Sequence, residues 1–115
     1  MQDLVVQMTS LQNKLSTAIK ELRKRGIRKA KAEAEYRTAL AEKMLLERDK
    51  GMPVTIIGDI CRGDNRIAEL KMKRDITETL YESCKQAIYA TKLEMNIITD
   101  FMRSERQGTQ WINLK

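Results

Sequence analysis

Apolar residues at the start of the chain recur in alternating steps of four and three, and few folds use such a spacing. It places these residues on one face of a helix that meets a partner helix along a seam. The residues of this first seam are Leu4, Met8, Leu11, Leu15, Ala18 and Leu22. Gly26 weakens a helix without necessarily breaking it, so we expect the helix to continue and its seam to shift, as at a coiled-coil stutter. The shifted seam should consist of Ile27, Ala30, Ala34, Ala41 and Met44 or Leu45.

The second half of the chain carries two apolar stripes at helical spacing. The first is another seam, made by Ile67, Leu70, Arg74, Thr77, Tyr81, Cys84, Ile88, Thr91, Met95, Ile98 and Met102. The second stripe lies further around the same helix and consists of Ile76, Leu80, Ala87, Ala90, Leu93, Ile97 and Phe101. A single partner helix covers only one stripe, and a long uncovered apolar stripe favours association. We therefore expect further copies of the chain to pack on the second stripe.

Stop signals end the first long helix near residue 50. Gly51 suits the left-handed position that follows a helix, and Pro53 cannot continue one. Arg48 and Lys50 complement the negative end of the helix dipole. We therefore expect the first long helix over residues 1–50.

The connector over residues 51–63 is too apolar for a flexible linker and too short for a domain of its own. We expect it to hold one short helix, capped by Thr55 and closed by Gly63, with Asp64 as the cap of the next helix. The parts that follow are a second long helix over residues 64–106 and a C-terminal tail over residues 107–115, which should pack on a neighbour.

These parts predict one domain of the all-α class. Its architecture would be a long antiparallel helical hairpin, packed as a coiled coil, with a short helical connector at the turn. Because the second stripe needs a cover, we expect the hairpins to assemble into a multi-helix bundle.

The residue types present exclude several kinds of chemistry. The chain has no histidine, and its two cysteines, Cys61 and Cys84, have no CxxC spacing. A histidine-based catalytic triad and a histidine-containing metal site are thus excluded, and we expect a non-catalytic protein with reduced thiols and no cofactor. No apolar run approaches the roughly 18 residues that span a bilayer, and the first residues do not have the character of a signal peptide. We expect a cytoplasmic protein that does not associate with membranes.

Positive charge is concentrated in one segment of the first helix. The formal net charge is +6, and residues 20–31 hold seven basic residues against a single acid, Glu21. With a turn near residue 57, this segment should lie beside the middle of the second helix. The predicted basic belt consists of Arg23, Lys24, Arg25, Arg28, Lys29, Lys31, Lys85, Tyr89 and Lys92. Such a belt suits a phosphorylated ligand or a nucleic acid, and the alternative is a solvated helix face.

Polar residues also gather around Gly58 and Gly63 in the connector. Glycines let a ligand approach the backbone, and the start of the second helix offers N–H groups that favour a phosphate or carboxylate. The predicted ligand-binding residues here are Thr55, Asp59, Arg62, Asn65 and Arg66. The alternative is a structural connector in which Arg62 and Arg66 pair with Asp59 and Asp64.

The stretch from Tyr36 to Arg106, and above all the connector GMPVTIIGDICRG at 51–63, resembles small coiled-coil hairpin proteins of temperate phages of Gram-positive bacteria. The resemblance implies a phage-encoded protein in the host cytoplasm. It also implies a role of the kind that small oligomeric phage proteins perform, namely binding and neutralising molecules of host defence. It transfers no activity to particular residues.

Three functions remain open. The first is a non-catalytic homo-oligomer, a dimer or larger, that sequesters a small anionic nucleotide signal, because symmetric copies bring several Arg side chains to one ligand. The second is an accessory protein that binds nucleic acid without sequence preference, marked by a steep salt dependence. The third is a structural or protein-inhibiting coiled coil that acts through its apolar stripes alone.

Overall fold

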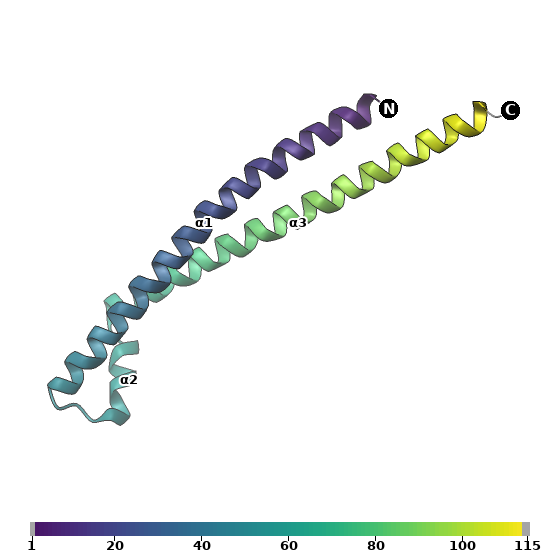
Figure 1. Cartoon of the computed structure of the whole chain (residues 1–115). Helices are drawn as coiled ribbons and strands as arrows, with labels where there is room; N and C mark the ends of the chain where they lie inside the picture. The colour runs from purple at the N-terminus through teal and green to yellow at the C-terminus, as the bar shows by residue number, and fades with distance from the viewer. Residues whose placement is uncertain (1, 114–115) are drawn as a thin grey trace. The chain divides into compact units, whose positions relative to one another are not determined.

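The computed structural model describes residues 2–113, and the side chains of residues 2–108. Two long helices and a short one between them make up this range: α1 (Gln2–Asp49), α2 (Val54–Arg62) and α3 (Asn65–Asn113) (Figure 1). No strand occurs within residues 2–113, so the predicted all-α class is confirmed. Over the same range, none of the helices has an apolar stretch long enough to cross a bilayer.

The chain divides into two compact units where the sequence predicts one domain. The first unit combines Met1–Leu22 with Ser83–Lys115, and the second unit is Arg23–Glu82. A pair of long helices makes contacts only between residues at the same level of the two helices. The contacts of such a pair therefore group locally along its length, without one shared core.

The end of α1 is defined by Gly51. This glycine has a φ of 83°, which confirms the left-handed conformation expected of it. Its N–H donates to the carbonyl of Arg48 at 2.9 Å, and the N–H of Met52 donates to the carbonyl of Glu47 at 3.1 Å. These two bonds satisfy the last carbonyls of α1 in the pattern of a Schellman motif.

The start of α2 differs from the prediction. α2 begins at Val54, its N-cap residue is Pro53, and no side chain caps its first N–H groups. The predicted cap at Thr55 is therefore wrong, because Thr55 already lies inside the first helical turn. At the other end, the N–H of Gly63 donates to the carbonyl of Asp59 at 3.0 Å and closes the helix.

α3 is longer than the sequence predicts. The expected end near Arg106, before a tail over 107–115, is wrong, since α3 continues to Asn113. A glycine inside a helix costs only about 1 kcal/mol relative to alanine. A Cβ at Gly108 would have nothing within 4 Å, and no proline follows to enforce a stop. The predicted packing of the tail on a neighbour concerns side chains outside the described ones.

The seam predicted for α3 is confirmed from Ile67 to Met102, because every one of its residues is buried or half-buried. The second stripe is exposed on the single chain, again as predicted. Its large members are between 45% and 55% exposed, namely Ile76, Leu80, Leu93, Ile97 and Phe101.

In α1 the predicted seam is confirmed up to Leu22, but the shift predicted after Gly26 is wrong. Buried and half-buried positions continue in steps of three and four through Arg25, Lys29, Ala32, Tyr36, Ala39, Lys43 and Glu47. The residues predicted for the shifted seam, Ile27, Ala30, Ala34, Ala41, Met44 and Leu45, are exposed. The seam keeps its register because long polar side chains occupy several of its positions, between Ala32, Tyr36 and Ala39, while the larger aliphatic residues Ile27, Met44 and Leu45 lie outside it.

The register between α1 and α3 in the second unit also differs from the prediction. Lys29 Nζ lies 4.7 Å from the ring centroid of Tyr81, and Lys43 Nζ lies 3.6 Å from a carboxylate oxygen of Asp64. A turn near residue 57 would instead place Lys43 opposite Met72. The difference arises because α1 runs on past the start of α3 before it ends.

Candidate functional site

The second unit contains an open groove among its three helices. Its volume is about 870 Å³, which is within the range of small-molecule sites. Its lining residues are Tyr36, Leu40 and Met44 of α1, Gly58, Cys61 and Arg62 of α2, and Ile67, Ala68, Lys71, Met72, Asp75, Ile76, Thr79 and Leu80 of α3. Most of this lining is apolar, with a few charged groups set into it. The groove therefore suits a ligand that combines an apolar body with charge.

Two cations and one carboxylate provide the charge of the groove. The cations are Arg62 and Lys71, and the carboxylate is that of Asp75. The Arg62 guanidinium donates to Oδ1 of Asp59, a residue outside the lining, and the Asp59 carboxylate raises the pKa of Arg62. Both side chains are about three-quarters exposed, so the pair is weak and can exchange for a ligand. Lys71 is exposed and makes no ion pair with a described residue. The one lining carboxylate, Asp75, already accepts from Arg74 at 3.0 Å, so the available charge of the groove is positive.

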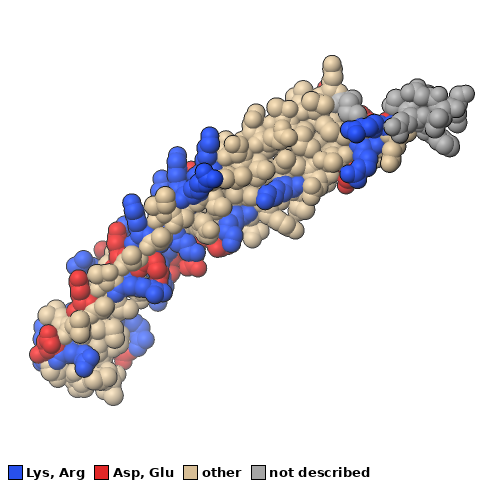
Figure 2. Space-filling model, in the orientation of Figure 1, with Lys and Arg blue, Asp and Glu red and all other residues tan. Residues whose placement is uncertain are grey.

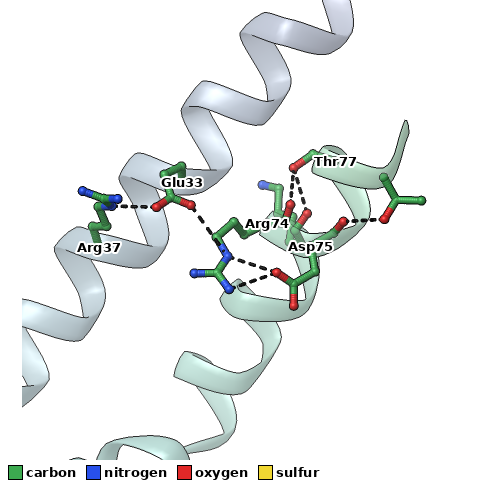
Figure 3. A network of polar contacts seen from close by, with 7 residues as sticks. Glu33, Arg37, Arg74, Asp75 and Thr77 are labelled. Carbon is green, nitrogen blue, oxygen red and sulfur yellow. Dashed lines mark hydrogen bonds and ion pairs between the residues drawn. The ribbon is translucent and has the colours of Figure 1, made fainter. Parts of the chain in front are cut away.

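A polar network links α1 to α3 beside the groove (Figure 3). Arg74 reaches from α3 toward Glu33 of α1, at 3.6 Å, and its Nε and Nη2 also donate to Asp75 Oδ1. The other oxygen of Glu33 accepts from Arg37 Nε at 2.6 Å. The Arg74 guanidinium lies 4.5 Å from the ring centroid of Tyr36, which lines the groove. The network holds this ring in place, because a cation over a ring face is attracted to it.

A second cluster of charges lies where the connector meets α1 and α3. Glu47 is only 4% exposed, and its Oε1 lies 3.0 Å from Lys43 Nζ and 3.7 Å from Lys50 Nζ. Lys43 also reaches Asp64, whose Oδ1 accepts the backbone N–H of Ile67 at 3.0 Å. The hydrogen bond from Lys43 lowers the pKa of Glu47, and the bond from the Ile67 N–H lowers the pKa of Asp64. The pKa of Lys43 is raised, chiefly by its hydrogen bond to Glu47.

The predicted connector residues are not brought to one point. Arg62 lines the groove, but Arg66 lines a separate small hollow beside Ala34 and Glu42. The others are exposed and line neither hollow, namely Thr55, Asp59 and Asn65.

The start of α3 offers fewer free N–H groups than the sequence led us to expect. The Asp64 carboxylate accepts a hydrogen bond from the backbone N–H of Ile67 at 3.0 Å. A well-formed cap thus occupies the place where an anion was expected. Of the predicted connector residues, only Arg62 remains part of the candidate groove.

The predicted basic belt is divided between the two units. Its second-unit members are Arg23, Lys24, Arg25, Arg28, Lys29 and Lys31, and its first-unit members are Lys85, Tyr89 and Lys92. Within the second unit, Tyr81 is an aromatic neighbour of the basic segment and lies under Lys29, whereas the predicted Tyr89 belongs to the first unit. Gly26 borders this ring, and a Cβ there would lie 3.4 Å from Tyr81 Cε2, at van der Waals contact. Arg25 is likewise held at the seam, where its Nη1 donates to the Leu80 carbonyl at 2.7 Å.

Four of the six basic side chains of this segment in the second unit are exposed, and none of the four makes a hydrogen bond or ion pair with a described residue. We call these four the basic face: Arg23, Lys24, Arg28 and Lys31. Lys and Arg side chains project along this part of α1 in the space-filling view (Figure 2).

Two groove residues, Lys71 and Tyr36, were not found by sequence reasoning. Lys71 lies one helical turn after the seam residue Ile67, but one lysine among 22 basic residues carries no signal of its own. Tyr36 was passed over because the predicted seam had shifted away from it. The groove depends on where α2 packs against α1 and α3, and the spacing of apolar residues does not predict that position.

No protein-family model, no curated protein and no solved structure matches the chain. Within the part of the chain that the structure describes, no group of Cys, Asp and Glu side chains is placed to hold a metal ion.

Proposed function

We propose that this chain is a non-catalytic binding protein that acts as a homo-oligomer of antiparallel helical hairpins and sequesters a small anionic ligand. The observation that carries the proposal is the groove of the second unit, where an apolar lining includes two exposed cations, Arg62 and Lys71. A nucleotide has the matching chemistry, with a planar base whose faces pack against apolar side chains, and charged phosphates. Arg and Lys both bind phosphate oxygens, Arg through paired hydrogen bonds.

The exposed second stripe of α3 supports the oligomeric part of the proposal. Side chains such as Leu93, Ile97 and Phe101 are about half exposed on the single chain. Stripes of this size on soluble proteins generally mark contact surfaces. Another copy of the same stripe is a suitable cover, because a two-fold axis brings identical apolar patches together.

The chemistry of the groove supports a binding role over catalysis. Its Cys61 thiol is 2% exposed, and its Asp75 carboxylate is engaged by Arg74. Neither is poised as a nucleophile or base, and the chain has no histidine to activate one. A phage-encoded protein of this kind would lower the concentration of a host nucleotide signal by holding it.

The proposal is tested by thermal shift with a panel of linear and cyclic nucleotides. We expect at least one nucleotide to raise the melting temperature of the wild-type protein, since a ligand that binds only the folded state stabilises it. The double variant Arg62→Ala/Lys71→Ala should lose this shift while keeping the helicity of the wild type.

The matched control is Arg48→Ala/Arg66→Ala, which removes the same charge outside the groove and should keep the ligand-induced shift. A wild-type protein whose melting temperature ignores the whole panel at millimolar concentration would overturn the proposal. If the control variant loses the ligand-induced shift as fully as the test variant, the nucleotide does not bind in the groove.

A further inference from the structure

The basic face of α1 holds unbalanced positive charge. No acidic residue lies between Glu21 and Glu33 in the sequence. On the C-terminal side, Glu33 accepts from Arg37 Nε at 2.6 Å, and Glu35, one turn beyond Lys31, lies 3.2 Å from Lys73 Nζ. The four cations of the face therefore have no counter-charge of their own within the second unit.

Other basic residues of the same unit are arranged differently. Several have a carboxylate within 4 Å, namely Arg37, Lys43, Lys50, Arg62, Lys73 and Arg74. Within the basic segment, Arg25 and Lys29 are directed to the Leu80 carbonyl and the Tyr81 ring. The six basic residues of the segment that belong to the second unit thus comprise two anchored cations, which fix it against α3, and four that project outward.

The spacing of the four side chains suits an extended anion. At about 100° and 1.5 Å per residue, Arg23, Lys24, Arg28 and Lys31 fall within an arc of about 140° along about 12 Å of helix. Successive phosphates of one DNA strand rise by about 3.4 Å, so a row of this length meets several of them. A single phosphate could contact only one or two of these side chains.

We propose that the basic face binds the phosphate backbone of nucleic acid, without reading its sequence, as a second activity separate from the groove. The groove residues of α1, Tyr36, Leu40 and Met44, lie on roughly the opposite side of this helix by their spacing. Contacts of Lys and Arg with phosphates position a protein on the backbone but carry no sequence information. Ile27, the apolar residue within the arc, has little to contact on a phosphate backbone.

Fluorescence anisotropy with a labelled, mixed-sequence DNA duplex tests the proposal. We expect log affinity to fall linearly with log salt, with a slope of about −3 to −4 per chain for four phosphate contacts. Between about 50 mM and 200 mM salt, this amounts to a loss of roughly 100-fold. Arg23→Gln/Arg28→Gln should reduce the slope by about two and weaken binding to duplexes of every sequence.

The matched control is Arg48→Gln/Arg66→Gln, which changes the net charge equally and should leave binding close to that of the wild type. Ile27→Ser should change the affinity less than two-fold. The proposal is overturned if the wild-type protein does not bind the duplex at about 50 mM salt, or if the control pair weakens binding as much as the test pair.

Polyglutamate separates a nucleic acid from an acidic protein as the partner. If the basic face recognises phosphates, the duplex should bind more tightly than polyglutamate of equal charge. Tighter binding of polyglutamate, or a large loss of binding in Ile27→Ser, would overturn the proposal in favour of an acidic protein. Because Arg62 and Lys71 take no part in this test, its result is independent of the nucleotide panel.

Discussion

Glu47 is a carboxylate at a seam position, where an apolar residue is usual. Its side chain is almost fully buried, but Lys43 and Lys50 place two ammonium groups beside it. Lys43 also bridges to Asp64, the cap of α3, so one lysine links the last turns of α1 to the first turn of α3. A buried charge that loses its partner is strongly destabilising, so these groups act as a unit.

This cluster predicts a loss of stability in acid. The pKa values of Glu47 and Asp64 are lowered in the folded protein from ordinary values of 4.5 and 3.8. As the pH falls, the unfolded chain therefore binds protons before the folded protein does. Both carboxylates contribute their stability above the ordinary pKa values, and this stability is lost as the pH falls through the lowered pKa values of the folded protein. The pKa of Lys43 is raised, so its contribution to stability is lost only in strong alkali. The melting temperature, followed by circular dichroism, should fall between about pH 5 and pH 3.

Glu47→Gln should lower the melting temperature at neutral pH and flatten this acid dependence. The matched control is Glu69→Gln, since Glu69 is exposed and makes no ion pair with a described residue. An acid dependence that is as steep in Glu47→Gln as in the wild type would show that the cluster does not control it.

At the scale of the helices, substitutions at two alanines of α1 distinguish the observed seam from the predicted one. Ala32 is 1% exposed, whereas Ala34, which the sequence placed in the shifted seam, is exposed. Ala32→Glu buries a charge without a partner and should cost several kcal/mol, whereas Ala34→Glu should stay within about 0.5 kcal/mol. Urea denaturation of the two variants measures the difference. Equal destabilisation by both would contradict the seam described here.

The helices also show which parts of the fold the sequence could predict. The seam of α3 is apolar at most positions, so periodicity alone located it from Ile67 to Met102. In the second half of α1 the seam includes Lys29, Lys43 and Glu47, and following the apolar residues led to the wrong face. A long polar side chain can occupy a seam when its charged end reaches a partner, and the sequence does not record such partners.

The candidate site was predictable to a smaller extent. Charge clustering located the basic face, and the glycines of the connector drew attention to Arg62. The groove could not be predicted, because it forms only where α2 packs beside α1 and α3. The cap at the start of α3 was predictable as well: Asp64 accepts from the Ile67 N–H, and its carboxylate lies where the sequence also suggested a bound anion.

At the scale of the whole molecule, each compact unit contains one buried thiol. Cys61 is 2% exposed in the second unit, and Cys84, whose Sγ donates to the Ala18 carbonyl at 3.4 Å, is 6% exposed in the first. If the units open separately, each thiol reports the opening of its own unit. Ile67→Ala, at a cost of about 2–5 kcal/mol, should speed the labelling of Cys61 far more than that of Cys84.

Ile98→Ala should have the opposite effect and speed the labelling of Cys84. The measurement is the reaction rate with a thiol reagent in single-cysteine variants, Cys84→Ala to follow Cys61 and Cys61→Ala to follow Cys84. If either core substitution raises the labelling rates of both thiols equally, the chain unfolds as one cooperative domain, as its length alone would suggest.

The second stripe of α3 predicts the assembly state of the whole molecule. The chain has a mass of 13.3 kDa, and light scattering of the wild type at micromolar concentration should return at least twice this value. Leu93→Asp/Ile97→Asp should shift the protein to the single-chain mass, because burying an apolar side chain contributes roughly 1.5–3 kcal/mol and burying an unpaired charge is costly. Asn96→Asp, a charge added at an exposed position away from the stripe, should leave the assembly intact. A wild-type protein of single-chain mass would contradict the homo-oligomer, and dissociation by Asn96→Asp would show that the contact lies on another face of α3.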